Sequence, residues 1–352
     1  MIDSSFWKNK KVLITGHTGF KGSWLSLTLL EMGSDIYGYS LPVSDQNKFY
    51  NLLNLKDRLN HHEGDIRSID TLEEKIKKIN PDIIFHLAAQ SLVGESYADP
   101  CTTFSTNIIG TSNLLLASRN LEGKRAIINI TTDKVYEVSA SDKAFVEGDK
   151  LGGFDPYSSS KACSEIITSS IRSSFFQLNT SAAIATARSG NVIGGGDWAK
   201  DRLIPDLIKA HRSKTKLLLR NINGVRPWQH VLDPISGYLK LAQYLFAKPI
   251  KYKTEFNFGP TSSQILTVNN IIDLIKQRNP EIFINHENES NRFHETHSLK
   301  LNSLRSQEVL KWKSKWSAVE AIAKTIDWYK AEEAGLNMLE YTKDQIKDYF
   351  ND

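Results

Sequence analysis

The chain has 352 residues, which at roughly 150 residues per domain predicts about two domains and a sizeable buried core. Hydrophobic residues make up 40% and charged residues 24%, a composition that excludes disordered, collagen-like and coiled-coil proteins. The 44 lysines and arginines exceed the 40 acidic residues by four, and the charges are interspersed, so we expect no nucleic-acid partner. No stretch has the pattern of a membrane span or a signal peptide, so we expect no membrane attachment.

The two cysteines, Cys101 and Cys163, are too few for a disulfide framework or a four-ligand zinc site. We therefore expect a reducing compartment, the cytoplasm, and no bound metal.

Apolar patterning along the chain alternates between strand-like and helix-like segments. The predicted strands are residues 11–15, 35–39, 81–87, 125–130 and 182–187. The predicted helices are residues 23–32, 72–79, 104–118 and 159–173. This alternation predicts an α/β fold with a Rossmann-type, doubly wound parallel sheet.

The alternation ends near residue 190, where three consecutive glycines follow at 194–196. We place a domain boundary there. Residues 1–190 are predicted to form the doubly wound domain, and residues 191–352 mainly a smaller mixed α/β lobe, with some segments returning to the first domain. Residues 285–305 are polar and are predicted to be loop or short strand.

Three glycines, Gly16, Gly19 and Gly22, lie between the first predicted strand and the first predicted helix. Without Cβ atoms at these positions, a pyrophosphate can approach the helix N-terminus, where free N–H groups and the helix dipole attract it. This arrangement predicts a dinucleotide site, whereas the glycines alone would also fit a tight structural turn.

The charged residues near the second predicted strand do not distinguish NAD from NADP. The acidic residue expected about 20 positions later is replaced by Gly38-Tyr39-Ser40-Leu41, and no arginine ends that strand to meet a 2′-phosphate. We favour NAD over NADP. Asp65 is a candidate for the adenine amino group and Ile66 for the adenine face, although a solvated turn explains these two residues equally well.

Tyr157 and Lys161 are four residues apart, so on a helix they share one face. An ammonium beside a phenol favours the phenolate and is expected to lower the pKa of Tyr157, which makes a base. Upstream, Thr132 follows an apolar strand and could bind a substrate hydroxyl, with Asp133 and Lys134 beside it. Taken alone, Tyr-x-x-x-Lys is common by chance and Asp133-Lys134 would suit an exposed turn.

Several blocks together resemble the CDP-glucose 4,6-dehydratases, members of the extended short-chain dehydrogenase/reductase superfamily. These blocks are the glycine loop, His86-Leu87-Ala88-Ala89-Gln90, Thr132-Asp133-Lys134, Tyr157 with Lys161, residues 187–198, residues 201–206 and residues 226–232. The resemblance extends from about residue 7 to about residue 245 and weakens afterwards. Lys134 distinguishes the CDP-glucose 4,6-dehydratases from the related dTDP-glucose dehydratases, which have glutamate at this position.

The resemblance implies a redox-neutral elimination with bound NAD. Tyr157, assisted by Lys161 and Thr132, would take the proton of the sugar 4-hydroxyl while hydride passes from carbon 4 to NAD. Lys134 would then remove the proton of carbon 5 as Asp133 protonates the departing 6-hydroxyl, and hydride would return to carbon 6. These roles need a neutral Lys134 and a protonated Asp133, which burial would favour.

The resemblance also implies the remaining site residues. A pyrophosphate suits the forked donors of Arg202 and Arg226, Trp198 and Trp228 could stack, and His86 is expected to be structural. Together the candidate cofactor residues are Gly16, Thr18, Gly19, Phe20, Lys21, Gly22, Tyr39, Ser40, Asp65, Ile66, Leu87, Ala88, Ala89, Tyr157 and Lys161. The candidate substrate residues are Gln90, Ser91, Asn191, Trp198, Arg202, Arg226 and His230.

Two departures from the family pattern affect the substrate more than the reaction. Residues 138–146 lack the usual asparagine, tyrosine and arginine, and Gly94 stands where the family usually has arginine. A different nucleotide sugar, an epimerase or reductase, and a non-catalytic dinucleotide-sensing protein therefore stay open. The resemblance further implies a homodimer, or a larger assembly, formed through the helices at 104–118 and 159–173, although both helices must also cover the sheet.

Overall fold

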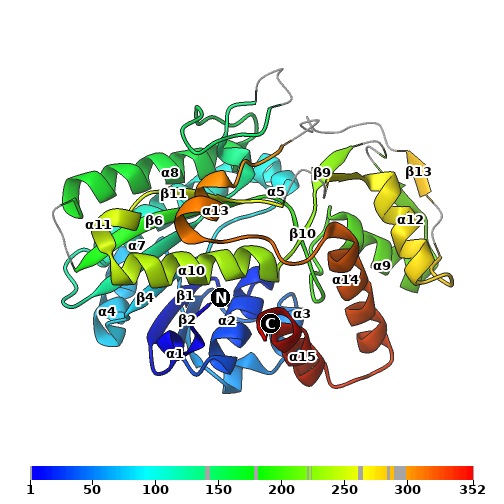
Figure 1. Ribbon diagram of the computed structural model, residues 1–352, viewed down its shortest axis with the longest axis horizontal. Helices are drawn as coiled ribbons and strands as arrows, with labels where there is room; N and C mark the ends of the chain where they lie inside the picture. The colour runs from blue at the N-terminus through cyan, green and yellow to red at the C-terminus, as the bar shows by residue number, and fades with distance from the viewer. Residues whose placement is uncertain are drawn as a thin grey trace.

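The computed structural model describes residues 2–138, 143–177, 181–219, 222, 224–260, 265–283, 286–288 and 299–351. A sheet with helices on both faces occupies one side of the molecule, and a smaller lobe with short strand pairs occupies the other (Figure 1).

The central sheet has seven strands, all parallel, in the order β11-β6-β5-β4-β1-β2-β3. Their bounds are β1 Lys11–Thr15, β2 Asp35–Ser40, β3 Asn60–Glu63, β4 Ile83–His86, β5 Arg125–Ile130, β6 Ala182–Ser189 and β11 Glu255–Phe258. The chain leaves β1 first toward β2 and later toward β4, so the strand order reverses between β1 and β4. In such sheets, ligands bind at the carboxyl ends of the strands beside this reversal.

Helices cover both faces of the sheet. The helices α4 Ile69–Ile79, α7 Gly110–Ala117 and α8 Pro156–Phe175 contribute to one apolar core with the sheet. The helices α2 Phe20–Glu31 and α10 Leu232–Ala247 contribute to a second core on the other face, which continues into the smaller lobe. Burial on two faces explains why β5, with the sequence Arg-Ala-Ile-Ile-Asn-Ile, is buried at every residue.

The remaining elements form the smaller lobe, the connections and the chain ends. The helices are α1 Ser4–Trp7, α3 Lys48–Leu52, η1 Leu55–Asp57, α5 Val93–Ala98, α6 Pro100–Phe104, the π-helix η2 Ser105–Ile109, η3 Asp133–Val135, α9 Leu203–Ser213, α11 Pro249–Tyr252, α12 Val268–Arg278, α13 Leu304–Leu310, α14 Ala318–Glu333 and α15 Met338–Phe350. The strands are β7 Val192–Ile193 with β10 Gln229–His230, β9 Val225–Pro227 with β12 Ile265–Thr267, and β8 Leu217–Leu219 with β13 His286–Asn288.

The predicted fold class is confirmed. The predicted strands and helices are present, β1 and β5 with the predicted bounds and the others with shifted ends. Helix α8 begins at Pro156, because the Asp155 side chain caps it by accepting from the Ser158 N–H. The segment at 104–118 contains the π-helix η2 rather than one regular helix. Of the predicted loop at 285–305, residues 285 and 289–298 lie outside the described part, β13 is a short strand, and the prediction is wrong at its end, where α13 begins.

The predicted boundary at residue 190 stays a prediction. Two later elements, α10 and β11, pack on or join the central sheet, and Lys343 of α15 forms an ion pair with Glu31 of α2.

Candidate active site

A cavity of about 1460 Å³ opens along the carboxyl ends of the strands and extends into the smaller lobe. Pockets for one small ligand are usually about 300–1,000 Å³, so this volume suits two ligands side by side. The predicted site residues that line it are Gly16, Thr18, Gly19, Phe20, Lys21, Gly22, Ser40, Asp65, Ile66, Leu87, Ala88, Ala89, Gln90, Ser91, Thr132, Lys134, Tyr157, Lys161, Asn191, Arg202 and Arg226.

The glycine loop has the geometry of an anion cradle. Gly16 has φ +72°, and a Cβ there would lie 2.7 Å from the backbone N of Ala88. A Cβ on Gly22 would lie 2.2 Å from the carbonyl oxygen of Gly16. Gly19 is the N-cap of α2, lines the cavity, and would place a Cβ no closer than 3.4 Å to that carbonyl. The first and third glycines are thus required by close packing, while Gly19 leaves the helix N-terminus open to a ligand.

The floor beside this cradle is fixed by buried histidine contacts. His86 lies between Thr15 and Thr111, with its Nδ1 2.7 Å from the first hydroxyl and its Nε2 3.1 Å from the second. Burial lowers the pKa of His86 to about 3, so it is neutral at physiological pH. This arrangement matches the structural role expected for His86.

Tyr157 and Lys161 lie on the first two turns of α8 and both line the cavity. The Lys161 ammonium donates to the carbonyl oxygen of Ile130 at 3.0 Å, and burial lowers the pKa of Lys161 to about 8. Burial raises the pKa of Tyr157 to about 12, an effect that the Thr132 side chain partly opposes. The expected net lowering of the Tyr157 pKa is therefore wrong for this structure, because desolvation dominates.

Thr132, Asp133 and Lys134 begin two residues after the end of β5, and residues 133–135 form the short helix η3. The Thr132 hydroxyl donates to Asp133 Oδ1 at 2.9 Å. Asp133 is buried, and burial raises the pKa of its carboxyl, as the proposed role of an acid requires. Lys134 lines the cavity and is only partly buried. Asp133 is not among the lining residues, although a Cβ on the lining residue Gly190 would lie 2.9 Å from its Oδ2.

Lys21 extends from the glycine loop toward the same end of the cavity. Its ammonium donates to the hydroxyls of Ser189 at 3.1 Å and Tyr238 at 3.3 Å. Burial lowers the pKa of Lys21 to about 7, with the positive charges of Arg202 and Lys161 adding to the effect. A cationic side chain is thus held between the dinucleotide cradle and the Tyr157 region.

The smaller lobe supplies Arg202 and Arg226 to the cavity. Arg202 donates to Asp197 Oδ2 at 2.8 Å, so its guanidinium is held by one buried carboxylate while about a third of the side chain stays exposed. Trp228 also lines the cavity, and within the described residues its buried indole N–H has no hydrogen-bond partner. Two arginines and a tryptophan therefore line the part of the cavity on the side of the smaller lobe.

Besides Asp133, three predicted residues, Tyr39, Trp198 and His230, are not among those that line the cavity. Tyr39 is buried beneath it, with its hydroxyl 3.4 Å from the carbonyl oxygen of Asp65. Trp198 packs edge-to-face against Tyr329, at 5.2 Å between ring centroids.

His230 is fully buried between Trp24 and Trp316, at centroid distances of 5.7 and 4.7 Å, so the structure places it in the core. A contact between His230 and a ligand in the cavity is not supported by this position.

Comparison with known proteins assigns the family. The family model described as GDP-mannose 4,6 dehydratase matches residues 13–325. The chain belongs to this family. It is also 40% identical to the CDP-glucose 4,6-dehydratase of Salmonella typhimurium, over 100% of this chain and 99% of the relative. The resemblance drawn from the sequence blocks is therefore confirmed.

Solved structures show the same fold at lower identity. The dTDP-glucose 4,6-dehydratase of Streptomyces venezuelae, crystallised with NAD and TYD, has a TM-score of 0.78 at 21% identity and covers 94% of this chain and 99% of its own. The UDP-glucuronic acid 4-epimerase of Bacillus cereus, in complex with UDP-glucuronic acid and NAD, has a TM-score of 0.79 at 21% identity, covering 92% and 99%. Dehydratases and epimerases thus share this fold, so the fold does not distinguish the two reactions, and the side chains of the site must do so.

Sequence reasoning missed several residues that shape this family member's site. Ser189 and Tyr238 hold Lys21, Asp197 holds Arg202, and Glu165 and Arg188 form a buried ion pair at 2.9 Å. One signal was available for Glu165, which follows Lys161 by four residues and so lies on the same helical stripe. In the described part of the chain, no helix is long and apolar enough to cross a membrane.

Proposed function

We propose that this protein is an NAD-dependent 4,6-dehydratase that converts CDP-glucose to CDP-4-keto-6-deoxyglucose. The observation that carries the proposal is the presence of two sets of groups at one end of the cavity, with Asp133 buried behind the lining residue Gly190. Tyr157 and Lys161 suit oxidation of a sugar hydroxyl, and Asp133 and Lys134 suit elimination of water. A 4-epimerase has no need of the second set, which is why we prefer the dehydratase.

The glycine cradle fits NAD. Gly19 leaves the N-terminus of α2 accessible, and Ser40, Asp65 and Ile66 line the cavity beyond it, where an adenosine would lie. Within the described residues, Arg67 is the arginine beside that position, and it is already paired with Asp65 at 2.6 Å, which favours NAD over NADP. When bound, NAD supplies a hydride acceptor for carbon 4 and then a hydride donor for carbon 6.

Tyr157 is the base for the 4-hydroxyl proton, and Thr132 hydrogen-bonds that hydroxyl. The phenol is protonated at neutral pH because burial raises its pKa to about 12, so its action as a base depends on positive charge nearby. Lys161, held by the carbonyl of Ile130, supplies this charge.

Elimination follows from the acidity of carbon 5 beside the new 4-ketone. Lys134 takes the carbon 5 proton, and Asp133 protonates the 6-hydroxyl, which leaves as water. The carbon 5 proton returns as hydride reaches carbon 6, so the sum of the reaction is loss of one water. The burial that raises the pKa of Asp133 favours the protonated acid that this step needs.

Arg202 and Arg226 are the proposed clamps for the substrate pyrophosphate, and Gln90, Ser91 and Asn191 line the sugar end of the cavity. The nucleotide is proposed to be cytidine, by analogy with the Salmonella typhimurium relative. Gly94 lines the cavity, and a side chain there would begin 3.4 Å from Asp201 Oδ2. Gly94 leaves room in the cavity, and this room would affect which other nucleotide sugars the protein accepts.

The test is to incubate the purified protein and NAD with CDP-glucose and, separately, with dTDP-glucose, UDP-glucose and GDP-mannose, and to measure loss of one water by mass spectrometry. We expect water loss from CDP-glucose. Water loss only from another nucleotide sugar would keep the reaction and replace the substrate. Water loss from none would contradict the dehydratase.

A Tyr157→Phe variant tests whether the measured reaction uses this site. Loss of a positioned base typically costs 10²–10⁴-fold in rate, so we expect a decrease of kcat in about that range with NAD still bound. A protein that only senses the dinucleotide would bind NAD equally well in both forms and would show no turnover in either.

We also propose a homodimer formed through α6, η2 and α8. Phe104, Ile109 and Ile166 are large apolar side chains exposed by 38%, 52% and 56% on these helices. Light scattering should give twice the monomer mass, and Ile109→Lys with Ile166→Lys should reduce it to the monomer. The unpaired thiols of Cys101 and Cys163 support the further proposal of a cytoplasmic location.

A further inference from the structure

Three consecutive residues at the end of β5 bind the helix that carries Tyr157. The Asn129 amide donates to Ser164 and Thr168 of α8, at 3.1 and 2.8 Å. The Ile130 carbonyl accepts from Lys161, and the Thr131 hydroxyl donates to Glu165 Oε1. The next residue is Thr132. The contact between Thr131 and Glu165 is thus the last one before the catalytic turn, defined here as residues 132–135.

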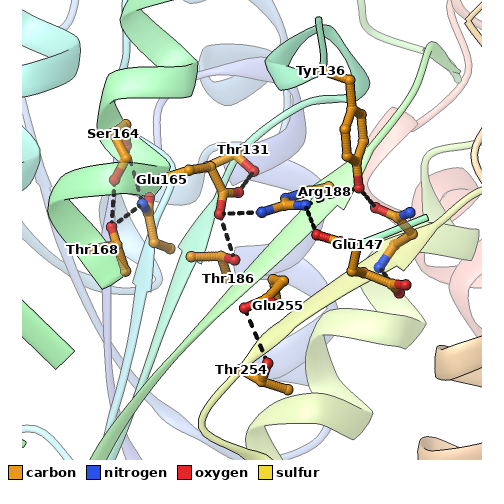
Figure 2. Close-up of polar contacts among 12 residues, drawn as sticks. Thr131, Tyr136, Glu147, Ser164, Glu165, Thr168, Thr186, Arg188, Thr254 and Glu255 are labelled. Atoms are coloured by element: carbon orange, nitrogen blue, oxygen red, sulfur yellow. Dashed lines mark hydrogen bonds and ion pairs between the residues drawn. The ribbon is translucent and has the colours of Figure 1, made fainter. Parts of the chain in front are cut away.

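The Glu165 carboxylate joins three elements. Besides Thr131, which directly follows β5, it accepts from the Thr186 hydroxyl and from Arg188 Nη2 on β6, both at 2.9 Å (Figure 2). Its side chain is 3% exposed and that of Arg188 is 4% exposed, so the ion pair is shielded from solvent. A buried carboxylate with three donors is a rigid junction, because each partner satisfies an otherwise costly charge.

Arg188 holds the other end of the catalytic turn. Its Nη1 donates to the Tyr136 hydroxyl at 2.9 Å and to the carbonyl oxygen of Glu147 at 3.0 Å (Figure 2). Tyr136 immediately follows the catalytic turn, and its hydroxyl donates onward to Asn257 Oδ1 at 2.7 Å. One ion pair is therefore bonded to the residue before the turn and to the residue after it.

We propose that the Glu165–Arg188 pair is a positioning pair that clamps both ends of the catalytic turn and so fixes Thr132, Asp133 and Lys134 relative to Tyr157 and Lys161. This inference rests on the proposed dehydratase function. Neither Glu165 nor Arg188 lines the cavity, so the pair acts through Thr131 and Tyr136, the residues that flank the turn. Misplacement of reacting groups by about 1 Å can cost on the order of 10²-fold in rate, which makes such a clamp measurable.

The decisive test compares two isosteric variants. Thr131→Val and Thr186→Val each remove one hydroxyl donor from the same carboxylate, but only Thr131 adjoins the catalytic turn. We expect Thr131→Val to lower kcat at least about tenfold with KM changed less than about threefold, and Thr186→Val to lower kcat less than about twofold. Similar melting temperatures of the two variants would show that a difference in kcat does not come from a difference in stability. Equal kcat values in both variants would overturn the proposal.

A second variant, Glu165→Gln, separates positioning from general loosening. The negative charge of Glu165 raises the pKa of Lys161 against burial. Its removal should move the alkaline limb of kcat to lower pH, whereas loosening alone would lower kcat at every pH without moving the limb.

A substrate-free readout keeps this test independent of the reaction. Backbone amide exchange of a peptide spanning residues 131–136, followed by mass spectrometry, should be faster in Thr131→Val than in Thr186→Val. If the wild type converts no nucleotide sugar while this difference is present, the proposed function fails and the clamp stands. If exchange is the same in both variants, the clamp fails whatever the substrate.

Discussion

Lys161 donates its hydrogen bond to the main-chain carbonyl of Ile130, the last residue of β5, at 3.0 Å. The ammonium therefore has a fixed place between strand and helix before any substrate contacts it. Burial lowers the pKa of Lys161 to about 8, so this fixed group is close to losing its charge at mildly alkaline pH.

The first prediction is an alkaline limb in the activity. Lys161 is charged below its pKa and neutral above it, and only the charged form favours the phenolate of Tyr157. We expect kcat to fall as pH rises through about 8. A Lys161→Arg variant keeps its charge at high pH and should lack this limb even if its kcat is lower. The kcat profile from pH 6 to 10 checks this, and an identical limb in both proteins would contradict it.

The second prediction separates two glycines of the cradle. In Gly22→Ala the Cβ would lie 2.2 Å from the Gly16 carbonyl, so backbone must move, at a cost of about 1–3 kcal/mol in unfolding free energy. In Gly19→Ala the closest atom is at 3.4 Å and φ is −75°, so stability should change little. NAD affinity should fall in both variants. Thermal melting and calorimetric NAD titration measure the two effects, and equal melting temperatures would refute this reading of the loop.

The third prediction concerns the arginine that Asp197 holds. Arg202→Lys replaces a forked donor by a point charge, so KM for the nucleotide sugar should rise about tenfold with kcat little changed. Arg212→Lys is the matched control, because Arg212 lies in the last turn of α9, which Arg202 precedes, pairs with Glu332, and does not line the cavity. Steady-state kinetics of both variants measure KM and kcat. A rise of KM in the control as large as that in Arg202→Lys would remove Arg202 from the clamp.

The fourth prediction links three buried histidines to acid stability. Burial lowers the pKa of His17, His86 and His230 to about 3, below the ordinary value of 6.5. Between pH 6.5 and 3 the unfolded chain binds protons that the folded state does not, so stability is lost as pH falls. Each histidine contributes up to about 1.4 kcal/mol per pH unit.

His230→Phe should remove one of these contributions. Urea unfolding at pH 7.5 and 5.5 should show a loss of stability that is smaller in this variant than in the wild type, by about 1 kcal/mol. The same loss in both proteins would mean that His230 does not enter the core in its neutral form.

Sequence reasoning predicted the sheet well, because β5 and β6 are buried on both faces and so consist of nearly unbroken apolar runs. Sequence reasoning predicted that His230 contacts the substrate, because residues 226–232 resemble the family. A segment that resembles a family contains residues that support the site as well as residues that line it. The position of His230, between Trp24 and Trp316, depends on contacts with α2 and with a segment almost 90 residues later.

The Glu165–Arg188 pair could not be predicted from the sequence for a related reason. Glu165 and Arg188 are 23 residues apart, and their pairing depends on how α8 is rotated over β5 and β6. Their partners Thr131 and Tyr136 are recognisable only after that rotation is known. A local signal such as the glycine cradle was accessible, because it involves neighbours in the chain.

Strand β11, at Glu255–Phe258, is the edge strand beside β6, although 65 residues separate the end of one from the start of the other. On the ribosome, the cradle, the catalytic turn and Tyr157 are therefore all synthesised before their sheet can be completed. During that interval the outer edge of β6 offers unpaired backbone groups to any other strand. The order of synthesis thus exposes the nascent chain to mispairing at the edge of β6 that β11 later covers.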